Sequence, residues 1–146
     1  MNIYVASSWR NERQPEIVAA LKRAGHEVYD FRNPAPGNTG FNWREIDPDW
    51  KNWAMERYRL MLNHPVAIKG FKTDMEALDW SDACVLVLPC GRSSHLELGY
   101  AVGRQKITCI LLGDGEPELM NKMADHICTG ISEVIEALST RGRVVK

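Results

Sequence analysis

The sequence lacks the patterns that would point to a metal, a redox pair, a membrane or a polyanion. Its four cysteines form no C-x-x-C pair, and its four histidines have no metal-ligand spacing. No apolar run approaches the roughly 20 residues that span a bilayer, and no basic segment leads into an apolar one at the start. The net charge of −1 gives no long-range attraction to nucleic acid. We therefore expect a cytoplasmic protein that binds no metal, no membrane and no nucleic acid polymer, and these observations leave a single nucleotide open as a ligand.

Two familiar phosphate-binding motifs are also missing. There is no G-x-G-x-x-G segment and no P-loop lysine, so neither a Rossmann dinucleotide site nor an NTPase is supported. A flavin-binding flavodoxin is disfavoured because the first loop has no Ser/Thr-rich phosphate cradle. We expect the protein to use no cofactor.

What is present is the composition of an ordinary globule, with 45% hydrophobic and 25% charged residues. The length of 146 residues suits one domain, residues 1–146, with a single core. The cysteines are expected to be reduced thiols packed in the core. Cys90, which falls in a turn, is the one whose reactivity we would test.

Apolar runs of strand length alternate with segments of helical spacing. Strands are predicted over residues 3–6, 26–30, 83–88, 107–112 and, minimally, 127–128. Helices are predicted over residues 14–24, 50–62, 73–80, 94–104, 119–124 and 131–138, with a loop over 33–42 and a frayed basic tail over 139–146. This alternation predicts an α/β fold: a flavodoxin-like parallel sheet of four or five strands with helices on both faces.

Residues 83–103 carry the most functional information. An apolar run ends at Leu88, a Pro-Cys-Gly-Arg turn follows, and Glu97 falls in what reads as the first turn of the next helix. Ligands of open α/β sheets bind outside the carboxyl ends of the strands, so Glu97 is a candidate nucleophile or an acceptor for a sugar hydroxyl. The same spacing fits a capping box, with Ser94 at the N-cap and Glu97 reaching back to its amide. The spacing alone leaves both roles open.

Two further segments allow two interpretations each. Asp74 follows Thr73 in an expected first helical turn, where the helix dipole alone would stabilise an acid; a functional role is the alternative. Residues 6–11 follow the first strand and offer Ser8 and Arg10 beside a helix N-terminus. Such a loop holds a phosphate or a sugar hydroxyl, or it is only solvated.

Five tryptophans are many for a chain of this length. Trp43, Trp50 and Trp53 crowd one region beside Phe41. We expect most of them to lie in the core, and the alternative is that they stack on a flat base.

Taken together, these segments resemble the nucleoside 2-deoxyribosyltransferase superfamily, which includes the nucleoside 5′-monophosphate N-glycosidases. Residues 3–9 with 12–14 look like the family's opening strand and loop, and residues 74–83 look like its aspartate-led helix into a buried strand. Residues 97–101, Glu-Leu-Gly-Tyr-Ala, match the nucleophile motif, which is the most specific element. Residues 117–120 look like the segment that reaches a neighbouring subunit's site in the transferases.

The resemblance implies a flavodoxin-like fold and cleavage of the N-glycosidic bond of a nucleoside or nucleoside 5′-monophosphate, with the sugar passed to another base or to water. It implies a site shared within a homodimer or larger homo-oligomer. Glu97 would be the nucleophile, Asp74 would orient the sugar or the base, and Tyr4 would hold Glu97. The implied substrate-binding residues are Ser8, Trp9, Arg10, Gly91, Ser93, Ser94 and Met120.

The chain departs from the family at two positions. The transferases have an acid six residues before the nucleophile and the nucleotide branch has a serine, whereas this chain has Gly91, with Ser93 and Ser94 as the nearest hydroxyls. The asparagine two residues before the transferases' methionine is Glu118 here. We keep a non-catalytic nucleotide-binding or sensing module as the alternative. If Glu97 is the nucleophile, we expect it to be ionised at pH 7, with helix N-terminal amides lowering its basicity.

Overall fold

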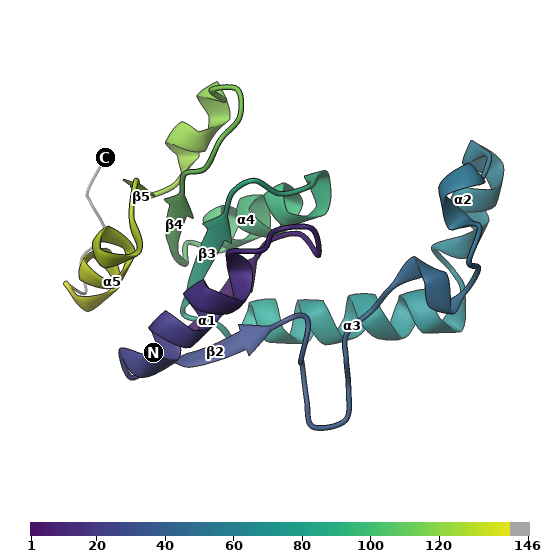
Figure 1. Cartoon of the computed structure of the whole chain (residues 1–146), viewed down its shortest axis with the longest axis horizontal. Coiled ribbons are helices and arrows are strands. Elements are labelled where there is room, and N and C mark those ends of the chain that lie inside the picture. The colour runs from purple at the N-terminus through teal and green to yellow at the C-terminus, as the bar shows by residue number, and fades with distance from the viewer. Residues whose placement is uncertain (141–146) are drawn as a thin grey trace.

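The computed structural model describes residues 1–140 and builds them around a five-stranded parallel sheet (Figure 1). The strands are β1 (Asn2–Ala6), β2 (Glu27–Asp30), β3 (Ala83–Val87), β4 (Ile107–Leu111) and β5 (His126–Cys128). Their spatial order is β2-β1-β3-β4-β5, and all neighbours pair in parallel. This is the strand order of flavodoxin-like folds, so the predicted fold class is confirmed.

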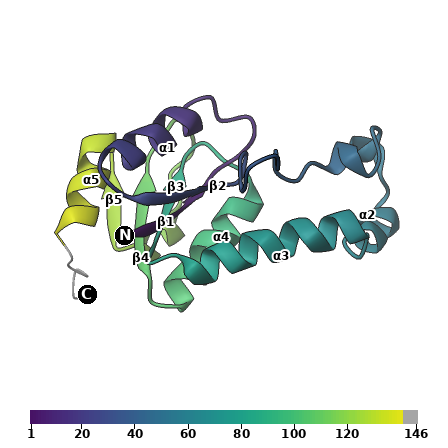
Figure 2. The same cartoon turned by 90° about the horizontal axis from the view of Figure 1, so that it is seen from below.

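Helices cover both faces of the sheet (Figure 2). α1 (Gln14–Arg23) and α5 (Ile131–Ser139) pack on one face, and α3 (Pro65–Trp80) and α4 (Arg92–Gly103) pack on the other. Successive strand residues point to opposite faces, so Val5 joins the α1 and α5 side while Tyr4 joins the α3 and α4 side. All of β3 is buried, as expected for a strand covered on both faces.

The beginning of α3 differs most from the sequence-based prediction. A helix was expected over residues 73–80, but α3 begins at Pro65, and His64 Nδ1 accepts a hydrogen bond of 3.2 Å from the Val66 amide. Gly70 lies in the interior of this helix because Phe41 packs closely on it: a Cβ built there would lie 2.8 Å from Phe41 Cβ. This long-range contact offsets the low helix propensity of glycine.

The longer α3 changes the interpretation of Asp74. Thr73 caps nothing; its hydroxyl donates within the helix to the carbonyl of Lys69 at 3.0 Å. Asp74 therefore lies in the helix interior, far from the N-terminal turn to which the dipole effect is confined. The explanation of Asp74 by the helix dipole is wrong.

The predicted helix over residues 50–62 is also interrupted. The chain forms short 3₁₀ helices η1 (Trp43–Glu45) and η2 (Trp50–Asn52), and then α2 (Met55–Met61). Trp53 is extended between η2 and α2, its Nε1 donates to Asp47 Oδ2 at 2.7 Å, and its ring meets Trp43 edge-on at 5.6 Å. These contacts fix the break, which helical spacing alone did not predict.

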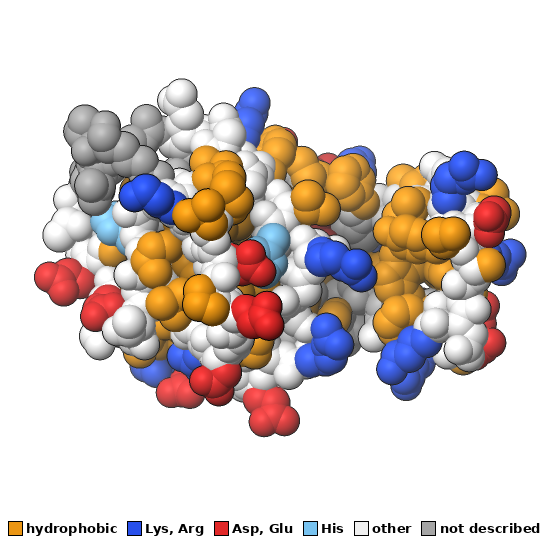
Figure 3. All heavy atoms as spheres, turned by 90° about the horizontal axis from the view of Figure 1, so that it is seen from above, with side chains coloured by type: hydrophobic (Ala, Val, Ile, Leu, Met, Phe, Trp, Pro, Cys, Tyr) orange, Lys and Arg blue, Asp and Glu red, His pale blue; other side chains and the backbone are white. Residues whose placement is uncertain are grey.

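Residues 41–72, which we call the arm, project beyond the edge of the sheet (Figures 1 and 2). Within it, Trp43 makes edge-on aromatic contacts with Phe41, Trp53 and Tyr58. The expectation that the tryptophans lie in the core is wrong for this group, because none joins either core cluster. Figure 3 shows apolar side chains exposed on the arm, and its exposed large apolar residues are Met55, Tyr58, Leu60, Leu62, Ile68 and Phe71.

The remaining elements follow the sequence closely. A 3₁₀ helix, η3 (Leu119–Met123), stands where a short helix was expected. Gly25, just after α1, has φ of +87°, a left-handed conformation that suits glycine at a helix end. From residue 141 on, the predicted frayed tail lies outside the described residues. Within residues 1–140, no helix is both long and apolar enough to cross a membrane.

Candidate active site

The loops that follow β1 and β3 are tied together at the carboxyl edge of the sheet. Ser7 Oγ donates to the carbonyl of Val87 at 2.9 Å, and Asn11 Nδ2 donates to the carbonyls of Val87 and Pro89, both at 3.1 Å. Ser94 Oγ donates to the Ser7 carbonyl at 2.7 Å. Because β1 and β3 are adjacent, this is the switch point at which ligands of open α/β sheets bind.

The start of α4 does not use the predicted capping box. α4 begins at Arg92, Gly91 is the N-cap residue, and no side chain among residues 1–140 caps this end. Ser94 is the third residue of the helix, and its buried hydroxyl bonds to Ser7 instead. Glu97 is therefore in the second turn rather than the first, and the capping role proposed for it is wrong.

Four side chains from four elements form an acidic centre: Tyr4 of β1, Tyr29 of β2, Asp74 of α3 and Glu97 of α4. Tyr4 and Tyr29 are partners in the strand register, and their rings stack with centroids 5.1 Å apart. Tyr29 Oη donates to Asp74 Oδ1 at 2.7 Å, and the Tyr4 side chain hydrogen-bonds to Glu97. The structure thus brings together Glu97, Asp74 and Tyr4, the three residues to which the family resemblance assigns catalytic roles.

The electrostatics of the centre are dominated by burial. Burial, assisted by the charge of Asp74, raises the pKa of Glu97 to about 8, and the hydrogen bond from Tyr4 opposes this rise. Burial also raises the pKa of Asp74, against the hydrogen bond from Tyr29. The expectation that Glu97 is ionised at pH 7 with lowered basicity is wrong, because burial and a second carboxylate outweigh any effect of the helix amides.

The two tyrosines remain hydrogen-bond donors at neutral pH. Burial is the main cause that raises the pKa of Tyr4 and that of Tyr29, and the neighbouring carboxylates raise both further. Two partly buried carboxyls that both have raised pKa values, on the face of the sheet that α3 and α4 cover, are candidates for a functional site.

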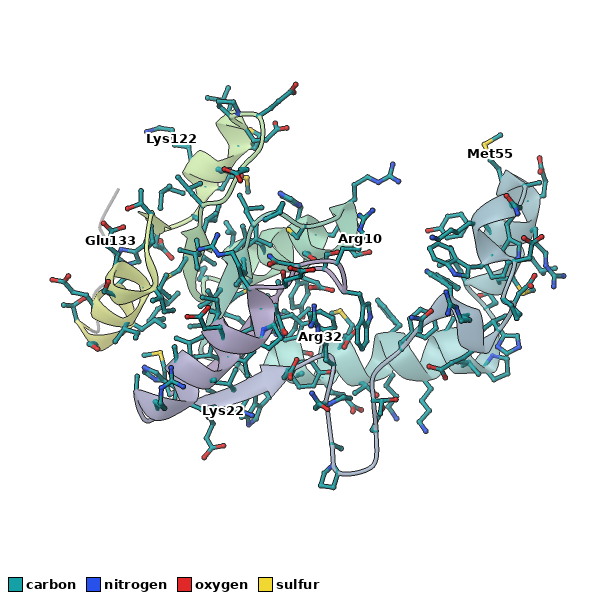
Figure 4. The ribbon with its side chains drawn as sticks, in the orientation of Figure 1. Arg10, Lys22, Arg32, Met55, Lys122 and Glu133 are labelled. Atoms are coloured by element: carbon teal, nitrogen blue, oxygen red, sulfur yellow. The ribbon has the colours of Figure 1, made fainter. Side chains whose placement is uncertain are left out.

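The loop after β1 carries three of the predicted binding residues. Ser8 Oγ accepts a hydrogen bond of 3.2 Å from the Arg10 amide, and Trp9 is 45% exposed. Arg10 is exposed beside this edge of the sheet (Figure 4), and within residues 1–140 no hydrogen bond or ion pair engages its guanidinium.

Sequence reasoning missed Arg32, which holds this loop (Figure 4). One terminal nitrogen of Arg32 donates to the carbonyls of Ser8 at 3.2 Å, Trp9 at 2.9 Å and Asn11 at 2.9 Å. The signal available in the sequence was that Arg32 stands two residues after a predicted strand. In the sheet that strand, β2, is adjacent to β1, so Arg32 lies beside the loop that follows β1.

Three predicted binding residues remain: Gly91 and Ser93 at the start of α4, and Met120 on η3. Gly91 has open space where a side chain would stand, and Ser93 is exposed on the first turn of α4. Met120, 66% exposed on η3, borders a hollow of about 450 Å³ with Leu119, Lys122 and Met123. Within one chain, Met120 is not part of the acidic centre.

Cys90 lies in the turn before α4, with its sulfur 3.8 Å from His95 Nδ1. Burial raises the pKa of its thiol to about 11, so the thiolate is scarce at neutral pH. Cys84, Cys109 and Cys128 are buried free thiols, as expected. Within residues 1–140, no group of three or more His, Cys, Asp or Glu side chains is placed to hold a metal ion.

The fold and the site define an α/β protein of flavodoxin-like topology with a partly buried carboxyl pair on the face of the sheet that α3 and α4 cover. Two solved structures are similar to it over nearly the whole chain. One is a 2-deoxyribosyltransferase from the psychrotolerant bacterium Bacillus psychrosaccharolyticus, at 20% identity and a TM-score of 0.56, covering 91% of this chain and 89% of that one. The other is the CMP N-glycosidase BcmB of Clostridium botulinum, at 16% identity and a TM-score of 0.50, covering 94% and 97%.

No family model matches the chain, and neither does any curated protein. The likeness to the two solved structures establishes a shared fold.

Proposed function

We propose that this protein cleaves the N-glycosidic bond of a nucleoside or nucleoside 5′-monophosphate and passes the sugar to water or to a second base. The observation that carries the proposal is the pairing of Glu97 with Asp74, backed by two protonated tyrosines, on the face of the sheet that α3 and α4 cover. The shared fold with a 2-deoxyribosyltransferase and a CMP N-glycosidase supports it.

Glu97 is the proposed nucleophile. Its carboxylate oxygen forms a bond to the anomeric carbon while the bond from that carbon to the base nitrogen breaks. The bonding electrons leave with the base, which takes up a proton. Positive charge develops on the sugar in the transition state, and a carboxylate beside it stabilises that charge. Water or a second base then attacks the same carbon and releases the Glu97 carboxylate.

Asp74 and Tyr4 have different proposed roles. Asp74 is half-buried and lies beside Glu97, so it orients a sugar hydroxyl or the base. Tyr4 is 1% exposed, so it acts through its hydrogen bond to Glu97 and does not reach the substrate itself.

A 5′-phosphate has a proposed place beside Arg10. The Arg10 guanidinium, the Ser8 and Ser93 hydroxyls and the α4 amides after Gly91 lie on the loops that meet at this edge. Such donors suit a phosphate. Ser94 contributes indirectly, since its hydroxyl is already committed to Ser7.

Met120 is proposed to act in the site of a second copy of the chain, in a homodimer or larger homo-oligomer. Leu119 is 81% and Met120 66% exposed, which leaves this apolar pair available for contact with another subunit. Light scattering after size exclusion gives the oligomeric state, and a protein that is active as a monomer would contradict this role.

The test of the function is release of free base, measured by chromatography. Deoxynucleosides, nucleosides and their monophosphates are each incubated with the protein, with and without a second free base. We expect release from at least one substrate, and a loss of several orders of magnitude in Glu97→Gln with the fold intact. Glu16→Gln, on the exposed side of α1, is the matched control and should keep wild-type activity.

The alternative, a nucleotide-binding module without catalysis, predicts a different result. Ligands would then raise the melting temperature without releasing base. That result, or near-wild-type turnover by Glu97→Gln, would contradict the proposed function.

A further inference from the structure

Tyr29 is joined to the acidic centre by two independent contacts. It lies opposite Tyr4 in the register of β1 and β2, and parallel strands direct both side chains to the same face. The two rings stack at 5.1 Å with an angle of 18° between their planes. This stacking fixes the plane of the Tyr29 ring and so the position of its hydroxyl.

The hydroxyl of Tyr29 is the partner of Asp74. Tyr29 Oη donates to Asp74 Oδ1 at 2.7 Å, and within residues 1–140 no other hydrogen bond reaches the Asp74 carboxylate. Asp74 lies in the interior of α3, so no helix terminus orients it. Its orientation beside Glu97 therefore depends on one donor from β2.

We propose that Tyr29 is a positioning residue for the N-glycosidic cleavage, whose hydroxyl holds the Asp74 carboxylate in the orientation that serves the substrate. This inference rests on the proposed function. Tyr29 acts through Asp74 on the bound sugar or base, because a carboxylate fixed by one hydrogen bond offers its second oxygen in a defined direction.

The surroundings of the pair make the effect of Tyr29 measurable. The groups that interact with the two carboxyls are Tyr4 from β1, Tyr29 from β2, Cys84 from β3 and Cys90 from the turn before α4. These neighbours are neutral at pH 7, since burial raises the pKa of each. Removal of the Tyr29 hydroxyl therefore removes the hydrogen bond that holds down the pKa of Asp74, and that pKa should rise.

The experiment compares Tyr29→Phe with Tyr100→Phe. Tyr100 Oη also donates to an aspartate, Asp79 Oδ1 at 2.6 Å, but on the exposed side of α3 and α4, so the same atom is removed outside the site. We expect Tyr29→Phe to lower kcat about tenfold, a loss of the size of one charged hydrogen bond, with KM changed much less. Tyr100→Phe should keep both constants.

A carbon-13 NMR titration of the aspartate carboxyls is the second readout, and it needs no turnover. We expect the Asp74 titration to move to higher pH in Tyr29→Phe and to stay in place in Tyr100→Phe. Wild-type kcat in Tyr29→Phe, or an unmoved Asp74 titration, overturns the proposal. If the wild type itself releases no base, the proposed function fails, and the titration then decides by itself whether Tyr29 holds Asp74.

Discussion

The indole Nε1 of Trp9 donates a hydrogen bond of 3.2 Å to the carbonyl oxygen of Phe41. Trp9 belongs to the loop after β1, and Phe41 is the first residue of the arm, so this bond joins the arm to the candidate site. The Trp9 ring also meets Phe31 edge-on at 5.4 Å. The place where the arm leaves the sheet is therefore built from the same loop that carries the predicted binding residues.

Gly40 is required by this junction. Its φ is +81°, and a Cβ there would lie 2.1 Å from the Phe31 carbonyl oxygen and 3.1 Å from Trp9 Cζ2. Gly40→Ala should therefore combine backbone strain with a steric clash. We expect it to lower the free energy of unfolding by about 2–4 kcal/mol, as measured by urea unfolding.

Gly37→Ala is the matched control for that substitution. Gly37 has a φ of +76°, but a Cβ there would meet nothing within 4 Å. Only the strain of a left-handed alanine remains, about 1 kcal/mol. Equal losses in the two variants would show that the close approach to Phe31 and Trp9 is unimportant.

Arg32→Lys tests the clamp on the loop after β1. Lysine keeps the charge but not the planar guanidinium, which lies over the Trp9 ring and directs one terminal nitrogen to the carbonyls of Ser8, Trp9 and Asn11. We expect the variant to lose about 1–3 kcal/mol of stability, with faster amide exchange over residues 8–11 and a higher KM. Arg23→Lys, at the exposed end of α1, should change none of these. Unchanged exchange over residues 8–11 in Arg32→Lys would contradict the clamp.

The sheet could be predicted from the sequence, but the arm could not. β1, β3 and β4 are short apolar runs, and runs of this kind between helical segments define a doubly covered parallel sheet. The arm is held by contacts between residues distant in sequence, such as Gly70 against Phe41. Local periodicity carries no information about such contacts, so the break at Trp53 and the true start of α3 were missed.

The site was predictable to the extent that it lies in local motifs. Glu97 was singled out by its position after the end of a predicted strand and by a family resemblance, and Asp74 by its expected helical position and the same resemblance. Tyr29 was missed because its role depends on its register with Tyr4, which the sequence of β2 does not specify. The raised pKa of Glu97 was missed because burial results from four elements packing together.

Arg10→Ala tests the proposed phosphate site. The Arg10 guanidinium is exposed at the carboxyl edge, and a charged hydrogen bond to phosphate would help to bind a nucleotide but not the matching nucleoside. We expect KM for the monophosphate to rise about tenfold or more, with KM for the nucleoside nearly unchanged. Arg23→Ala serves as the control for loss of one positive charge. An equal effect of Arg10→Ala on both substrates would remove the phosphate role.

The pH dependence of base release tests the state of Glu97. Burial and the charge of Asp74 raise the pKa of Glu97 to about 8, and the nucleophile must be ionised to react. The value of kcat/KM should therefore rise about tenfold per pH unit below this pKa and level off above it. If the pH profile of kcat/KM has its inflection near 4.5, the ordinary pKa of glutamate, the Glu97 carboxyl is solvated and its pKa is not raised.

The raised pKa of Glu97 also predicts how the stability of the protein depends on pH. Glu97 has a pKa near 4.5 in the unfolded chain and about 8 in the folded one, so between these values the folded state binds more protons. Its contribution to stability is fully present below pH 4.5 and is lost as the pH rises through about 8. The Glu97→Gln variant carries no such charge. The difference between its free energy of unfolding and that of the wild type should therefore rise in favour of the variant, by about 1–3 kcal/mol, as the pH rises from 4.5 to 8. Glu16→Gln should follow the wild type, and a constant difference between Glu97→Gln and the wild type would contradict a raised pKa at Glu97.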